Sequence, residues 1–316
     1  MNATKINIVC ATDDKYVPYC GVMLTSLFEN NKDSQVDVYI MIDKPLQERN
    51  REKFAELANR YGVSISYCVV DKRFLENFPL KGDGVDHWSI VTYYRLYAAE
   101  LLPETVDKVL YLDCDIIVDG SLRELFGMDW DGIAAGAVPD MCTEWTEYYE
   151  RLGYDRSKGY FNAGVVLINL DYWRKNHTGQ QCLDWLANNY DKVFNNDQDV
   201  LNVVLADKKK TLSVTYNYQI QLRMPHFFNT FSKNLKEDVL KTEHPVIIHY
   251  AAELKPWMAY YYSYPFNDVW HKYKKMSLWK NMSDALPARR KPIAFVKRYI
   301  LWPLGIKLKK PSFVNE

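Results

Sequence analysis

Asp113 and Asp115 are the residues of this 316-residue chain whose type and spacing point most directly to chemistry. They follow the apolar residues 110–112, a pattern that predicts a buried strand ending in two carboxylates. Because side chains alternate along a strand, the two aspartates would share one face, with Cα atoms roughly 6.5 Å apart, and Cys114 would point away. One cation can draw such carboxylates together, and without it their repulsion raises the pKa of one of them. An isolated Asp-x-Asp can equally be two solvated aspartates in a turn.

The composition is that of a soluble globular protein, with 48% hydrophobic and 25% charged residues. The length suits one large α/β domain or two small ones. The six cysteines are scattered without a C-x-x-C pair, and the N-terminus lacks the apolar region of a secretory leader. No apolar run reaches the eighteen or so residues of a spanning helix. We therefore expect a reducing, cytoplasmic location.

The charge is unevenly distributed along the chain. Of 40 basic and 40 acidic residues, eight basic and one acidic lie in residues 287–316, which leaves 32 basic and 39 acidic, a net charge of −7, in the first 286. A nucleic-acid-binding body is therefore not expected. We predict a main domain over residues 1–280 and a basic, aromatic tail over 281–316. The tail suits a peripheral helix on an anionic membrane, at the inner face of the cytoplasmic membrane. The alternative is a helix packed on the domain with a solvated basic side.

Strands alternate with helices along the sequence, which predicts an α/β fold with a parallel sheet of the nucleotide-binding type. The chain has only 13 glycines and no P-loop or dinucleotide fingerprint, so bound phosphates would be neutralised by a metal and side chains. The predicted strands cover residues 6–10, 36–42, 63–70, 108–118, 162–169 and 246–248, and the predicted helices cover 21–29, 47–61 and 89–102.

Six short motifs, one of which contains the aspartate pair, occur in order along the chain. They are Ala-x-Asp-Asp at 11–14, Tyr-x-Arg-Leu at 93–96, Leu-Tyr-Leu-Asp-x-Asp at 110–115, Phe-Asn-Ala-Gly-Val at 161–165, Asp-Gln-Asp at 197–199, and His-Tyr at 249–250 with Lys-Pro-Trp at 255–257. With these motifs, roughly residues 5–280 resemble the retaining glycosyltransferases of family 8, the group of bacterial lipopolysaccharide galactosyl- and glucosyltransferases and glycogenin. The resemblance implies a GT-A type fold, a Rossmann-like, mostly parallel mixed sheet flanked by helices.

The resemblance implies a metal site made by Asp113, Asp115 and His249. Carboxylate oxygens with one imidazole suit Mn²⁺, and Mg²⁺ less well. The alternative for His249 is a hydrogen-bonded core histidine. Lys255 would contact the diphosphate and stabilise the leaving UDP, and its alternative is a solvated surface lysine.

The resemblance also implies a binding site for UDP-galactose or UDP-glucose. Asp13 could instead serve only the turn and helix start that follow it. Asp197 could act as a helix N-cap, and Asp199 is expected at the helix start in a supporting role. The implied uridine-binding residues are Ala11, Thr12, Asp13 and Tyr16; those around the donor sugar are Arg95, Asp140, Asn162, Asp197 and Gln198; Cys114 and Ala252 complete the donor-binding set.

The implied reaction is hexosyl transfer with retention to a hydroxyl of a lipopolysaccharide-like or lipid-linked glycan. No placed carboxylate nucleophile is evident, so we expect front-face attack, with Gln198 stabilising positive charge and Asp197 and Lys255 completing the catalytic set. A non-catalytic nucleotide-sugar binder and, with less support, a haloacid-dehalogenase-type phosphatase are the alternatives. Residues 250–254 read Tyr-Ala-Ala-Glu-Leu where close relatives often have Gly-Pro, which leaves the acceptor open. The sequence does not decide between galactose and glucose.

Overall fold

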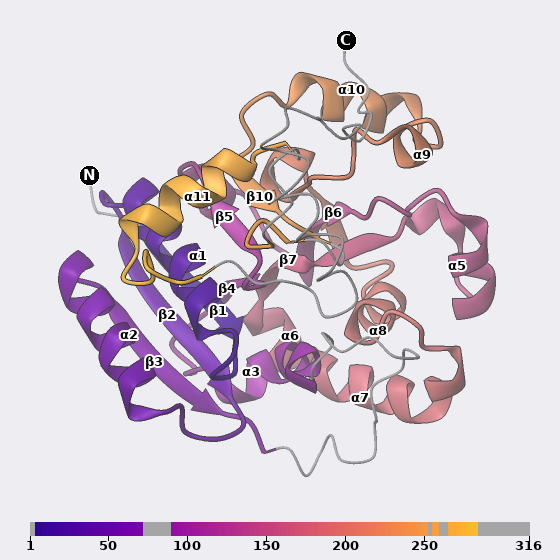
Figure 1. Ribbon diagram of the computed structural model, residues 1–316. Coiled ribbons are helices and arrows are strands. Elements are labelled where there is room, and N and C mark those ends of the chain that lie inside the picture. Colours follow the sequence, from indigo (N-terminus) through magenta and orange to yellow (C-terminus); the bar gives the residue numbers. More distant parts are fainter. Residues whose placement is uncertain (1–3, 72–89, 252–254, 259–264, 284–316) are drawn as a thin grey trace, which may run out of the picture.

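A seven-stranded sheet forms the centre of the protein, seen here in a computed structural model that describes residues 4–71, 90–251, 255–258 and 265–283 (Figure 1). Its strand order is β3-β2-β1-β4-β7-β6-β8. Every neighbouring pair is parallel except the two that involve β7. The prediction of a mixed, mostly parallel sheet is therefore confirmed.

The first half of the sheet is built by alternating strands and helices, as the sequence predicts. The strands are β1 (Lys5–Ala11), β2 (Gln35–Ile42) and β3 (Ser64–Val69), and the intervening helices are α1 (Val17–Asn30) and α2 (Glu48–Tyr61). Asp14 ties the two helices together, because its carboxylate accepts hydrogen bonds from the backbone N–H of Gln47 and the side-chain amide of Asn50, at 2.9 and 2.8 Å. Gly62 ends α2 with a positive φ of 64°, which favours glycine.

The second half of the sheet contains β4 (Lys108–Leu112), β6 (Ala135–Pro139), β7 (Phe161–Asn169) and β8 (Lys209–Thr211). Strand β7 is buried along nearly its whole length and runs antiparallel to both β4 and β6. Its N-terminal end therefore lies beside the C-terminal end of β4, where Leu112 pairs with Val165. This reversal brings two motifs from distant parts of the sequence to one edge of the sheet.

The prediction of one strand over residues 108–118 is wrong, because this segment is divided between the large sheet and a second, three-stranded sheet. The chain leaves the large sheet after Leu112, turns through residues 113–115, and continues as β5 (Ile116–Val118) in the small sheet. There β5 pairs with β10 (Ile247–His249), which also pairs with β9 (Tyr218–Gln219). The two aspartates therefore lie in a turn between sheets, and they do not alternate along one strand.

Helices cover both faces of the large sheet. One face packs against α1 and α2, and the other packs against the segment 90–101 and the later helices α6 to α8. The helix predicted over residues 89–102 consists of two pieces, the 3₁₀ helix η2 (Ile90–Tyr97) and the short α-helix α3 (Ala98–Leu101). The other helices are α4 (Arg123–Gly127), α5 (Thr146–Leu152), α6 (Leu170–Asn176), α7 (Thr178–Asn189), α8 (Asp197–Val204), α9 (Pro225–Phe228), α10 (Lys233–Lys241) and α11 (Asn267–Met276), with short 3₁₀ turns at Arg156–Lys158, Tyr190–Lys192 and Val214–Tyr216.

The last described segment packs on the first helix. Helix α11 lies against α1 (Figure 1), and the Trp279 ring that follows α11 is buried beside Gly21. The predicted tail over residues 281–316 lies almost wholly outside the described residues, so its membrane attachment stays a prediction. Among the described residues, no helix combines the length and apolar character that a membrane crossing requires.

We expect Gly21→Ala to destabilise the fold. The new Cβ would lie 2.0 to 2.4 Å from three atoms of the Trp279 ring. Overpacking of this kind costs about 1–3 kcal/mol, more than the roughly 1 kcal/mol that alanine gains over glycine in a helix. Urea unfolding measures the difference. Gly127→Ala, where nothing lies within 4 Å of the new Cβ, is the matched control. A Gly21→Ala protein at least as stable as the wild type would contradict this packing.

Candidate active site

A cavity of about 420 Å³ opens at the carboxyl ends of β1 and β4, where α/β proteins bind their ligands. Its lining comes from the loop after β1, the turn after β4, the start of β7 and the start of α8. Thirteen predicted site residues line it: Ala11, Thr12, Asp13, Tyr16, Arg95, Asp113, Cys114, Asp115, Asp140, Asn162, Asp197, Gln198 and Lys255. His249 lies just behind this lining, and Ala252 and Glu253 lie outside the described residues.

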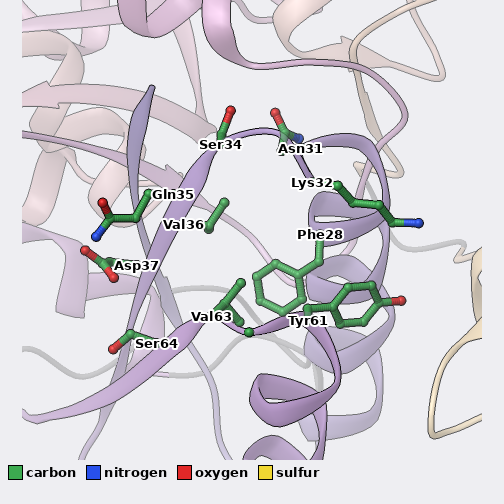
Figure 2. Close-up of a pocket in the computed structure, with 11 residues that line it drawn as sticks. Phe28, Asn31, Lys32, Ser34, Gln35, Val36, Asp37, Tyr61, Val63 and Ser64 are labelled. Atoms are coloured by element: carbon green, nitrogen blue, oxygen red, sulfur yellow. The ribbon is translucent and has the colours of Figure 1, made fainter. Parts of the chain in front are cut away.

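A second cavity, of about 460 Å³, lies at the amino ends of β2 and β3, on the other side from the first cavity. Figure 2 shows it between the end of α1, the start of β2 and the end of α2. Its lining contains a single carboxylate, Asp37, which is near Lys5, and its Asn31 side chain is taken up by bonds to Leu27 and Leu122. This cavity offers no cluster of reactive groups, so the candidate site is the first one.

Asp113, Asp115 and His249 form the one cluster found among the described residues that could hold a metal ion. Their ligand atoms all lie within 4.8 Å of one another. The turn between the two sheets places the carboxylates, and the pairing of His249 with Ile116 places the imidazole beside them. Gly164 makes the room, because a Cβ there would lie 2.3 Å from His249 Cε1 and 2.8 Å from Asp113 Oδ2. Two carboxylates and one imidazole fit a divalent cation such as Mn²⁺.

Lys255 is the positive partner of Asp115. Its Nζ lies 2.5 Å from Asp115 Oδ2, and His249 Nε2 lies 3.5 Å from Asp115 Oδ1. Burial alone raises the pKa of Asp115, but the Lys255 ammonium and the His249 imidazole hold that pKa well below its usual range. The Lys255 side chain is only 12% exposed, so the alternative of a solvated surface lysine is wrong. His249 is both a buried, hydrogen-bonded histidine and a neighbour of two carboxylates.

Arg95 joins Asp113 to Asp197. Its guanidinium is buried, lies 3.0 Å from Asp113 Oδ1 and 2.9 Å from Asp197 Oδ2, and stacks 4.0 Å above the Tyr111 ring. Burial raises the pKa of Asp197 to about 6, while the charge of Arg95 acts against that rise. Asp197 is the first residue of α8 and accepts a bond from the hydroxyl of Thr92. The N-cap prediction is therefore wrong for Asp197, because Asn196 holds the cap position with a φ of 48°.

Asp140, Asn162 and Gln198 are joined at one carboxylate oxygen. Asp140 Oδ2 accepts hydrogen bonds from the amide of Asn162 at 2.9 Å and from Gln198 Nε2 at 3.3 Å. The side-chain oxygen of Gln198 accepts the N–H of Ala163 at 3.0 Å. An amide oxygen has a second lone pair, so this bond fixes the Gln198 plane and leaves the oxygen able to face a ligand.

Asp13 makes the predicted turn and also lines the cavity. Its Oδ1 accepts the backbone N–H groups of Lys15 and Tyr16 at 2.9 and 3.0 Å, which confirms the turn chemistry, and the residue also lines the cavity. Cys114 donates from Sγ to the carbonyl of Ala11 at 3.3 Å, which links the aspartate turn to the loop after β1. The predicted uridine set therefore lies beside the predicted metal site.

Asp199 has the supporting role that was expected. It is fully buried behind the cavity, ion-paired with Arg151 at 2.8 Å and bonded to the hydroxyl of Tyr160 at 2.6 Å. Sequence reasoning missed Tyr111, whose hydroxyl donates to Asp113 at 3.1 Å, and Asn217, which contacts His249 at 2.9 Å. Tyr111 lies inside a recognised motif, whereas Asn217 is in no motif and gives no sequence signal of its own.

The comparisons with known proteins agree with this geometry. The profile of glycosyl transferase family 8 matches residues 7–260. The chain belongs to this family of retaining hexosyltransferases. The prediction of an enzyme with this activity class is confirmed, and the haloacid-dehalogenase alternative is wrong.

Three relatives illustrate the similarity. A lipopolysaccharide 1,2-glucosyltransferase of Escherichia coli strain K12 is 30% identical over 303 residues, which cover 93% of this chain and 84% of that protein. The lipopolysaccharide 1,3-galactosyltransferase of Salmonella typhimurium strain LT2 is 26% identical over 95% of this chain and 86% of its own length. The crystal structure of galactosyltransferase LgtC in complex with donor and acceptor sugar analogs has a TM-score of 0.77 and 28% identity, over 91% of this chain and 99% of that one. The similarity to LgtC confirms the GT-A type fold.

Gly164→Ala should weaken Mn²⁺ binding by at least about tenfold, the lower end of the loss expected when a metal ligand is no longer held in position. The added methyl would collide with His249 and Asp113 and push them apart. Titration of the protein with Mn²⁺, monitored by electron paramagnetic resonance, measures the change. Gly127→Ala again serves as the control, and an unchanged affinity in Gly164→Ala would show that the cluster does not hold the ion.

Lys255→Met should change two measurements in opposite directions. Without the ammonium beside Asp115, Mn²⁺ alone should bind more tightly, by about tenfold or more, because two unit charges about 4 Å apart repel by about 1 kcal/mol even in water and the ion carries two charges. Turnover of a UDP-sugar should fall, because the same ammonium is placed to neutralise a diphosphate. Lys32→Met, on the opposite cavity, is the control. Weaker Mn²⁺ binding in Lys255→Met would contradict the competition between the two cations.

Proposed function

We propose that this enzyme transfers galactose or glucose, with retention, from a UDP-sugar to a hydroxyl of a cell-surface glycan of the lipopolysaccharide type. The observation that carries the proposal is the convergence of Asp113, Asp115 and His249 within 4.8 Å beside a cavity that the described residues of the predicted donor site line. Family membership limits the reaction class, and this cluster explains how a chain without a glycine-rich phosphate loop could bind a diphosphate.

A divalent ion, which we take to be Mn²⁺, would be held by Asp113, Asp115 and His249. When bound it would neutralise charge on the diphosphate. The side chains of the site divide the remaining work. Asp13 offers a carboxylate to the uracil ring, Tyr16 an aromatic surface, and Lys255 a positive charge to the departing UDP.

The proposed chemistry uses the front face of the sugar. The bond between the anomeric carbon and the UDP oxygen breaks, the acceptor oxygen bonds to that carbon on the same face, and the acceptor proton passes to the departing phosphate oxygen. Gln198 is oriented for stabilising the positive charge that develops on the sugar, because Asp140 and the Ala163 N–H fix its amide plane. The buried ion pair of Asp197 with Arg95 lies next to it and holds the start of α8 in place.

The names of the relatives support the proposed acceptor class, but they do not decide between galactose and glucose as the transferred sugar. One acts as a lipopolysaccharide glucosyltransferase and another as a lipopolysaccharide galactosyltransferase, at similar identity to this chain. The two donors differ only in the orientation of one hydroxyl. Polar groups placed around the sugar, such as Asp140 and Asn162, would read that difference by geometry. Lipopolysaccharide-type glycan is the acceptor class that both names support.

Gln198→Ala should lower hexosyl transfer by about a hundredfold or more, the size of effect seen when a preorganised charge-stabilising group is removed. Affinity for the UDP-sugar should change little. A thermal-shift screen of UDP-sugars with Mn²⁺ first identifies the donor, and UDP release in the presence and absence of oligosaccharides then measures transfer and hydrolysis. Gln180→Ala, on the exposed face of α7, is the matched control.

Two outcomes would contradict the proposal. Binding of a UDP-sugar without any hydrolysis or transfer would favour the non-catalytic binder. A Gln198→Ala enzyme with the full rate and the same product anomer would remove Gln198 from the mechanism.

A further inference from the structure

Asn217 lies between the metal cluster and the donor-sugar residues. Its side chain has no exposed surface, and the residue sits between the 3₁₀ turn Val214–Tyr216 and β9. Asn217 Oδ1 is 2.9 Å from His249 Nδ1, and Asn217 Nδ2 donates to Asn162 Oδ1 at 2.9 Å. Both ends of one buried amide are therefore used, each on a different part of the site.

The direction of these hydrogen bonds is determined by Asp140, which bonds to Asn162 at the other end of the series. The carboxylate of Asp140 can only accept, so the group of Asn162 that faces it is the NH₂. The oxygen of Asn162 then faces the other way, where it also accepts the backbone N–H of Gly164 at 3.0 Å. That oxygen in turn requires the NH₂ of Asn217, which leaves the Asn217 oxygen facing His249.

An amide oxygen can only accept a hydrogen bond, so His249 Nδ1 must carry the proton. The lone pair of the neutral imidazole is then on Nε2, the nitrogen that faces Asp115 at 3.5 Å. We propose that Asn217 is a positioning residue that sets the tautomer of His249 and makes Nε2 the metal-binding atom. Orientation of a metal-binding histidine by a bond to its other nitrogen is a general device in proteins.

The same arrangement links the two halves of the site. Asp140 Oδ2 orients Asn162, and through it His249, while it also bonds to Gln198. One carboxylate therefore fixes both the proposed metal-binding atom and the proposed charge-stabilising amide. The inference rests on the proposed function for its role in catalysis, but the tautomer and the affinity for Mn²⁺ alone can be measured without any UDP-sugar.

Two substitutions of Asn217 test the contributions of its two hydrogen bonds separately. Asn217→Leu has a similar shape and removes both bonds, so Mn²⁺ affinity should fall ten- to a hundredfold. Asn217→Asp keeps an acceptor for His249 and loses the donor to Asn162, so its Mn²⁺ affinity should stay within a few-fold of the wild type. Asn31→Leu removes a buried asparagine with two well-defined bonds far from the cluster and should leave Mn²⁺ binding unchanged.

The decisive readout is the ¹⁵N spectrum of the histidines in the metal-free, full-length protein, recorded at a pH high enough for the imidazole to be neutral, where it distinguishes Nδ1–H from Nε2–H. We expect Nδ1–H for His249 in the wild type and in Asn217→Asp, and a mixture in Asn217→Leu. An Nε2–H imidazole in the wild type would overturn the inference even if no variant folds. Equal Mn²⁺ affinities for Asn217→Leu and the wild type, or equally weak binding by Asn217→Asp and Asn217→Leu, would overturn it as well. Failure of hexosyl transfer with the tautomer intact would count against the proposed function alone.

Discussion

Two negative charges held close together are the constraint on which the site depends. Asp113 and Asp115 are partly buried in a turn that two sheets fix from both sides, so neither can move far from the other. Their repulsion must be balanced by positive charge. Arg95 does this for Asp113, and Lys255 does it for Asp115. Positively charged side chains therefore lie on two sides of a gap. The oxygen and nitrogen atoms that face this gap suit a divalent metal ion.

The site also requires that the backbone of β7 approach the side chains of the cluster closely. The antiparallel strand β7 passes beside the end of β4 and carries Gly164 directly under the cluster, where no Cβ fits. The same strand carries Asn162 and Ala163, whose groups face Asp140, Asn217 and Gln198. The Phe-Asn-Ala-Gly motif therefore gives both close packing and hydrogen bonds, and this one strand connects the proposed metal-binding cluster to the residues proposed to surround the donor sugar.

The sequence predicted most of the elements of the first half of the sheet, and thirteen of the fifteen site residues that it predicted line the cavity. The limits of strands and helices were predicted less well where the local sequence pattern and the tertiary contacts favour different structures. Residues 108–118 form an apolar run interrupted by two aspartates, which as a local pattern fits one long strand. The structure divides it because β5 pairs with β10, more than a hundred residues later. Residues 90–97 were predicted as part of a longer helix, and they form the separate 3₁₀ helix η2, in which Tyr93, Tyr94 and Arg95 are buried.

The sequence by itself determined the family and its chemical groups, because ordered motifs of Asp, His, Asn, Gln and Lys are readable as residue types and spacings. Only the tertiary structure decided how those groups pair. The contacts of Arg95 with Asp113 and Asp197, of Lys255 with Asp115 and of His249 with Asn217 all join residues from different elements of the chain. A buried amide such as Asn217 has no local signature, since its role is defined by the donors and acceptors that the fold brings to it.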